Sequence, residues 1–199
     1  TDYLNLKVSF QKLSSDGSRY GRTAYVDTEY QLEGDGSQRS IFLKTNDEVL
    51  DKSFIEPENI RKLCGKRRFT LAHECAHQIL FQLDADDRKI ACHKRPEVRG
   101  NGSRVLRTQE DWNEWQANAL GAAILMPQSE VDRAMWFINS RKPLTCYGWH
   151  FYDKDQVKID TFCSVFGVSR SAAAIRLEQL GYLNRKKDYE YRDPLEVWP

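Results

Sequence analysis

Short runs of β-branched and aromatic residues occupy the first 50 residues of the chain, and turn-forming residues separate them. Gly17, residues 34–36 and residues 46–47 provide the turns. This pattern predicts a small sheet, which we expect to be antiparallel. The predicted strands are Lys7–Phe10, Thr23–Val26 and Ile41–Leu43.

After Pro57 the apolar residues recur at the three- and four-residue spacing of helices. The polar stretch between Asp84 and Arg107 predicts a long loop within this part of the chain. The predicted helices cover Glu58–Cys64, where Gly65 ends the helix; Arg68 to about Leu83; about Gln109 to Leu125; a stretch from Ser129; and two short segments of Val157–Leu183 separated by residues 167–169.

This order of elements predicts an α+β fold, in which the small N-terminal sheet packs on the helix that begins near Arg68 and further helices follow. We expect one domain over residues 1–138. Residues 139–199 would form a helix-turn-helix-like segment and a C-terminal extension.

The composition is that of a globular protein, because 40% of the 199 residues are hydrophobic and 30% are charged, which excludes a disordered chain. Thirty Lys and Arg balance 29 Asp and Glu, so the net charge of +1 gives no reason to expect nucleic acid as a partner. No apolar run approaches the roughly 18 residues of a membrane-spanning helix. Five scattered cysteines without a Cys-x-x-Cys pair favour reduced thiols and a cytoplasmic location.

The most specific motif is His73-Glu74-Cys75-Ala76-His77, an HExxH sequence within a predicted helix. Residues four apart share one helix face, so the imidazoles of His73 and His77 can converge on one cation. Glu74 could then act as a general base on a water bound to that cation. The alternative is a helix with two surface histidines and a solvated glutamate.

The next predicted helix offers a third ligand. Glu114 and Asn118 lie one turn apart, so Glu114 could bind the metal while the Asn118 carbonyl oxygen accepts a hydrogen bond from a liganding imidazole. The alternative is that Glu114 is an exposed helix charge.

Together these residues resemble the ImmA/IrrE family of metallopeptidases over about residues 40–183. The resemblance rests on Arg68-Phe-Thr-Leu-Ala-His-Glu-x-x-His, on Glu114-x-x-Ala-Asn and on Leu125-Met-Pro127. It implies a gluzincin-like site in which His73, His77 and Glu114 hold zinc. Glu74 takes the position of the catalytic carboxylate. The ligand types leave manganese open as well.

The resemblance implies a cytoplasmic zinc-dependent endopeptidase whose protein substrate is a DNA-binding repressor of the phage or stress-response type. A second hypothesis is a regulator with little or no catalytic activity that acts as a protein- or DNA-binding module. A third is an accessory protein with a structural metal. The sequence determines neither the oligomeric state nor the scissile bond.

The segment Phe162–Leu183 is similar to the helix-turn-helix-like region that follows the protease helices in this family. Residues 156–199 contain seven Lys and Arg against six acids, which is a poor phosphate-binding surface. We therefore expect a packing or substrate-docking role and no direct nucleic-acid binding.

The remaining candidate cysteines, histidines and tyrosines lie outside the proposed ligand set. Cys75 lies about 200° around the helix from His73 and is expected to be an inert buried thiol. The Cys92-His93 pair lacks the spacing of a structural zinc site. The candidates for stabilising an oxyanion are Tyr147, His150 and Tyr152.

Overall fold

The computed structural model describes residues 2–32, 39–83, 90–94, 108–148 and 150–191. The chain forms two compact units, Thr1–Ile124 and Leu125–Pro199. Helices and small sheets occur in both units, so the predicted α+β class is confirmed. These units are defined by contacts within the chain, and the predicted domain boundary between residues 138 and 139 stays a prediction.

The first unit is built on a four-stranded sheet with the strand order β1-β5-β2-β6. β2 runs antiparallel to both of its neighbours, as predicted, but β1 runs parallel to β5, so the sheet is mixed and the prediction of a purely antiparallel sheet is wrong. Local patterns of apolar residues carry no information on strand direction, which depends on where the chain returns. The strands are β1 (Lys7–Gln11), β2 (Arg19–Ala24), β5 (Asp47–Asp51) and β6 (Ile90–Lys94).

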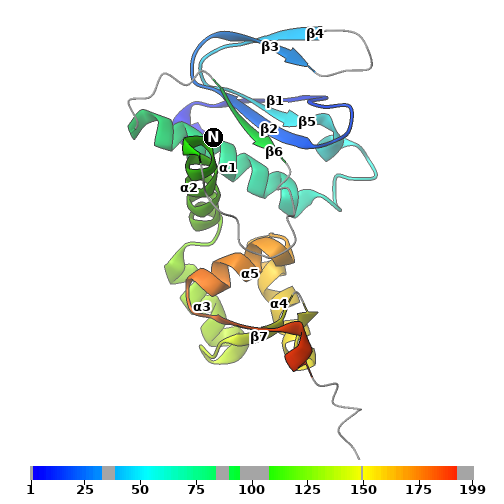
Figure 1. Ribbon diagram of the computed structural model, residues 1–199, viewed down its shortest axis with the longest axis vertical. Coiled ribbons are helices and arrows are strands. Elements are labelled where there is room, and N and C mark those ends of the chain that lie inside the picture. Colours follow the sequence, from blue (N-terminus) through cyan, green and yellow to red (C-terminus); the bar gives the residue numbers. More distant parts are fainter. Residues whose placement is uncertain (1, 33–38, 84–89, 95–107, 149, 192–199) are drawn as a thin grey trace, which may run out of the picture. The chain divides into compact units, whose positions relative to one another are not determined.

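A hairpin of β3 (Thr28–Leu32) and β4 (Arg39–Leu43) packs on one face of this sheet (Figure 1). The Arg22 guanidinium lies 3.4 Å from the centre of the Tyr30 ring, a cation–π contact that lets a charged residue of β2 be buried here. The apolar core between hairpin and sheet consists of Leu13, Ala24, Tyr30, Leu43 and Val49.

The helix α1 (Cys64–Leu83) packs on the opposite face of the sheet (Figure 1). Its buried Gln78 donates hydrogen bonds from Nε2 to the Thr23 hydroxyl and to the Ala24 carbonyl of β2, at 2.6 and 3.0 Å. The Tyr25 and Phe81 rings stack with centroids 4.0 Å apart. These contacts fix how α1 is rotated over the sheet.

The start of α1 differs from the prediction. Turns replace the predicted helix over residues 58–63, whereas Cys64 begins α1 and Gly65, expected to end the predicted helix, lies inside α1. Short 3₁₀ helices cover Asp2–Leu4 and Lys52–Ile55.

The helix α2 (Gln109–Leu125) has the predicted bounds, and it approaches α1 closely at Gly121. A methyl group at Gly121 would lie 3.1 Å from the His73 backbone, tighter than an ordinary van der Waals contact. The absence of a side chain at this position therefore allows the two helices to pack at short range. The buried residues of α2 are Asn113, Ala117, Gly121 and Ala122.

The second unit combines α3 (Gln128–Asn139), α4 (Asp153–Phe166) and α5 (Arg170–Gln179) with a small sheet. Ser169 caps α5 by accepting a hydrogen bond from the Ala172 amide, and Gly167 ends α4 with a left-handed φ of 62°. The helix-turn-helix-like assignment of this pair stays a prediction. The sheet has the order β8-β7-β9, with β7 (Leu144–Tyr147), β8 (His150–Phe151) and β9 (Leu183–Lys186), and a 3₁₀ helix follows at Asp188–Glu190.

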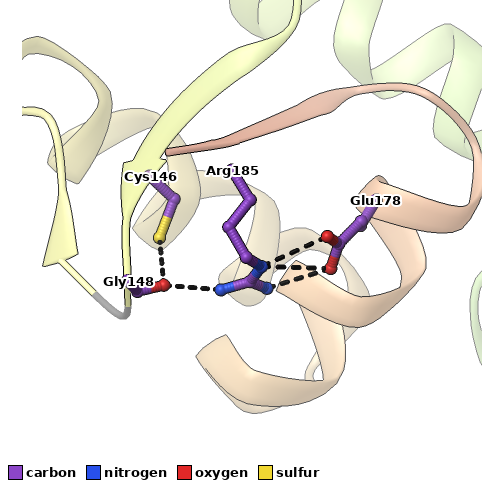
Figure 2. A network of polar contacts seen from close by, with 4 residues as sticks. All are labelled: Cys146, Gly148, Glu178 and Arg185. Carbon is purple, nitrogen blue, oxygen red and sulfur yellow. Dashed lines mark hydrogen bonds and ion pairs between the residues drawn. The ribbon is translucent and has the colours of Figure 1, made fainter. Parts of the chain in front are cut away.

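A polar network joins β9 to α5 and to the end of β7 (Figure 2). Arg185 binds the Glu178 carboxylate and also donates to the Gly148 carbonyl, which in turn accepts from the Cys146 thiol at 3.2 Å. Gly148 has a left-handed φ of 57°, which glycine adopts at little cost.

In the described part of the chain no helix is both long and apolar enough to cross a bilayer.

Glu48 is a fully buried carboxyl on the face of the sheet that carries α1, because it pairs with Thr23 of β2. Neither of its carboxyl oxygens has a hydrogen-bond partner among the described residues. Burial disfavours the charged form and raises the pKa of Glu48 to about 8. Glu48 is therefore neutral in the folded protein at pH 7.

The raised pKa of Glu48 predicts that the free energy of unfolding decreases as the pH rises. Below about pH 4.5 Glu48 is protonated in the folded and in the unfolded protein. Between about pH 4.5 and 8 only the unfolded chain loses this proton, so unfolding becomes easier as the pH rises. The total change is on the order of 5 kcal/mol. Glu48→Gln should flatten this slope in urea titrations at several pH values. The exposed control Glu58→Gln should retain the pH dependence of the parent protein. If Glu48→Gln showed the same pH dependence as the parent, the pKa of Glu48 would not be shifted.

The left-handed backbone at Gly148 predicts that Gly148→Ala lowers the free energy of unfolding by about 1–2 kcal/mol. Gly17→Ala is the matched control, because Gly17 has a φ of 66° with open space around it. A methyl group at Gly148 would also meet the Asp188 carboxylate, so thermal unfolding should show a larger loss at Gly148 than at Gly17.

Candidate metal centre

The two histidines of the HExxH motif face each other on α1. His73 and His77 are both buried, and their Nε2 atoms lie 3.0 Å apart. Their four-residue spacing puts both rings on the same side of the helix, as predicted. The alternative of two surface histidines does not fit this burial.

Glu114 reaches the same point from α2. Its Oε1 lies 3.1 Å from Nε2 of His77, and its Oε2 lies 3.4 Å from Nε2 of His73. The Glu114 side chain is only 15% exposed, so it is not the solvated helix charge considered as an alternative. The three side chains offer ligand atoms that all lie within 4.8 Å of one another.

This donor set fits a divalent cation. Tetrahedral zinc has ligands about 2.0–2.1 Å away, which places neighbouring donor atoms about 3.3 Å apart. The observed separations of 3.0, 3.1 and 3.4 Å are close to that spacing. Two imidazoles and one carboxylate are also the ligand set of catalytic zinc sites, which leave a fourth position open.

Glu74 is fully buried where α1 meets the sheet. Its carboxylate lies against Gly21 of β2, since a methyl group at Gly21 would come within 2.5 Å of Oε1. The motif thus sends its two imidazoles toward α2 and its carboxylate toward β2. Whether Glu74 acts as a base stays a prediction.

Asn118 lies one turn after Glu114 and is partly buried. Its Nδ2 donates a 2.7 Å hydrogen bond to the Glu114 backbone carbonyl. This bond ties Asn118 to the turn that carries Glu114. The predicted role of the Asn118 carbonyl oxygen as acceptor for an imidazole stays a prediction.

Cys75 is buried, and desolvation raises the pKa of its thiol to about 11, in keeping with the expected inert role. The side chains of Cys92 and His93 lie outside the described residues. Tyr147, His150 and Tyr152 belong to the second unit, and their oxyanion role stays a prediction.

Sequence reasoning did not identify Gly21 and Gly121, the two glycines that contact the residues of the site. An isolated glycine within a strand often marks a close approach of another group, and that signal was available at Gly21. At Gly121 the available signal was a run of small residues in a helix. Neither signal names the residue that would be contacted.

Comparison with known families identifies a match. The sequence profile of the IrrE N-terminal-like domain, a peptidase family, matches residues 64–178. No curated protein and no solved structure matches the chain. The matched region covers more than half of the chain and includes His73, His77 and Glu114, which confirms the predicted resemblance: the chain belongs to the IrrE N-terminal-like family of metallopeptidases.

Proposed function

We propose that this protein is a zinc-dependent endopeptidase that cleaves a specific protein substrate. The observation that carries the proposal is the convergence of two buried imidazoles and one carboxylate, on α1 and α2, next to the buried Glu74. The family supports peptide hydrolysis as the reaction. Zinc is the proposed metal because its preferred ligand number and spacing match the three donors.

His73, His77 and Glu114 would hold the metal, and Glu74 would act as the general base and general acid of the reaction. Zinc, when bound, supplies a Lewis acid that polarises the scissile carbonyl and acidifies a water. Glu74 would accept the proton that the attacking water loses and then deliver it to the leaving amine nitrogen. Burial of Glu74 limits exchange of that proton with bulk solvent.

We propose a DNA-binding repressor as the substrate and the cytoplasm as the location, on the basis of the family resemblance. The second unit would serve as a packing or docking module. Three of its arginines support this reading, because they are engaged within the unit: Arg170 binds Asp160, Arg185 binds Glu178, and Arg176 donates to the Met126 carbonyl. Because these three charges are paired or hydrogen-bonded within the unit, they are less able to bind a phosphate backbone, which disfavours the DNA-binding alternative.

Removal of the third ligand should remove the metal. After exposure to stoichiometric zinc and desalting, elemental analysis should find about one zinc per chain in the parent protein and almost none in Glu114→Ala, because two imidazoles alone hold zinc weakly. Glu110→Ala, an exposed change on the same helix, is the matched control and should retain zinc. Equal zinc in Glu114→Ala and the parent would argue against this ligand set. The same analysis after manganese exposure shows whether the site also retains manganese.

Removal of the base should separate metal binding from cleavage. Glu74→Gln should retain zinc, since its side chain is not a proposed ligand, and should lose at least about 100-fold in cleavage rate. The measurement is the appearance of a new protein N-terminus, detected by mass spectrometry, when the zinc-loaded protein is incubated with purified candidate repressors. Glu110→Gln serves as the control. Full activity in Glu74→Gln would exclude the mechanism.

A further inference from the structure

Gly21, in the middle of β2, is the neighbour against which the Glu74 carboxylate lies. We propose that Gly21 is a positioning residue for Glu74: its missing side chain creates the space that holds the carboxylate in its working orientation. This inference rests on the proposed function, because it assigns Glu74 the role of base.

Gly21 contacts Glu74 and Thr70 through van der Waals packing. A methyl group at Gly21 would lie 2.5 Å from Glu74 Oε1, 3.1 Å from its Cδ and 2.7 Å from Thr70 Cγ2. Ordinary contacts between such atoms are about 3.5 Å, so Oε1 would have to move by about 1 Å. Both neighbouring side chains come from α1, one turn apart.

The backbone conformation at position 21 does not require a glycine. Gly21 is absent from the described glycines with positive φ, so its backbone is one that other residues adopt. A glycine inside a strand weakens the strand by roughly 0.5–1 kcal/mol relative to alanine. The close approach of Glu74 and Thr70 is the feature that distinguishes this position, and two of the three nearest atoms belong to Glu74.

The strand is also irregular at this point. The register between β2 and β6 shifts between Arg19 and Gly21, whereas Gly21 still pairs with Leu50 of β5. Such irregularities are common next to active sites, where they redirect the backbone. Here the shift falls on the strand segment that borders the Glu74 carboxylate.

The effect of Gly21 is separable from metal binding. The three atoms nearest to the added methyl group belong to Glu74 and Thr70, and none belongs to His73, His77 or Glu114. Gly121 provides the contrast, because a methyl group there would meet the His73 backbone at 3.1 Å. Gly21→Ala should therefore disturb the base and Gly121→Ala the ligands.

The first test measures ligand binding to the zinc-loaded protein. Acetohydroxamate chelates zinc and gives its hydroxyl proton to a carboxylate beside the metal, whereas imidazole binds zinc without needing that carboxylate. In Gly21→Ala, as in Glu74→Gln, the Kd of acetohydroxamate should rise about tenfold while the Kd of imidazole and the zinc content stay unchanged. In Gly121→Ala zinc affinity itself should fall. Equal weakening of both ligands in Gly21→Ala, or weakening of neither, would overturn the proposal.

The second test needs neither zinc nor ligand. In a Thr70→Ser background, which removes the Cγ2 contact, Gly21→Ala should destabilise the metal-free protein when Glu74 is present and much less when Glu74 is alanine. If Gly21→Ala does not fold alone, recovery of folding in Gly21→Ala/Glu74→Ala supports the contact. An equal loss of stability in both backgrounds contradicts it. A parent protein that holds no zinc would defeat the proposed function, and this cycle would still decide whether Gly21 positions the carboxylate.

Discussion

The burial of α1 between the sheet and α2 is the constraint on which the rest of the first unit depends. One helix has to present two imidazoles to α2 and a carboxylate and an amide to β2, all with little or no exposure. The Gln78 hydrogen bonds to β2 set the rotation of the helix, and the glycines at positions 21 and 121 allow short approaches on both sides. A small change in the rotation of α1 would separate the three ligands.

The sequence revealed the parts of the site that depend on local spacing. The four-residue interval between His73 and His77 fixes their shared face on any helix, and the bounds of α2 followed from the spacing of its apolar residues. Contacts between distant segments were not predictable, because no local pattern encodes them. The parallel pairing of β1 with β5 and the contact of Gly21 with Glu74 both belong to this group.

Buried polar groups are numerous on the α1 face of the sheet, and they differ in how they are accommodated. Gln78 is hydrogen-bonded to β2, whereas Glu48 remains uncharged at neutral pH as the result of its burial. Leu50 of β5 lies on the same face, because it pairs with Gly21, and it is fully buried. An apolar cluster also lies on the other face, under the β3–β4 hairpin. The polar groups near the candidate site therefore share their face of the sheet with buried apolar residues.

The ligand set is divided between two helices that lie far apart along the chain. His77 and Glu114 are separated by more than 30 residues, so the donors on α1 are synthesised well before the donor on α2. A growing chain that has not yet made α2 contains the two imidazoles but lacks the third ligand, Glu114, and two imidazoles alone bind zinc weakly. The proposed peptidase activity would therefore require both α1 and α2, and no shorter N-terminal piece of the chain would contain the full ligand set.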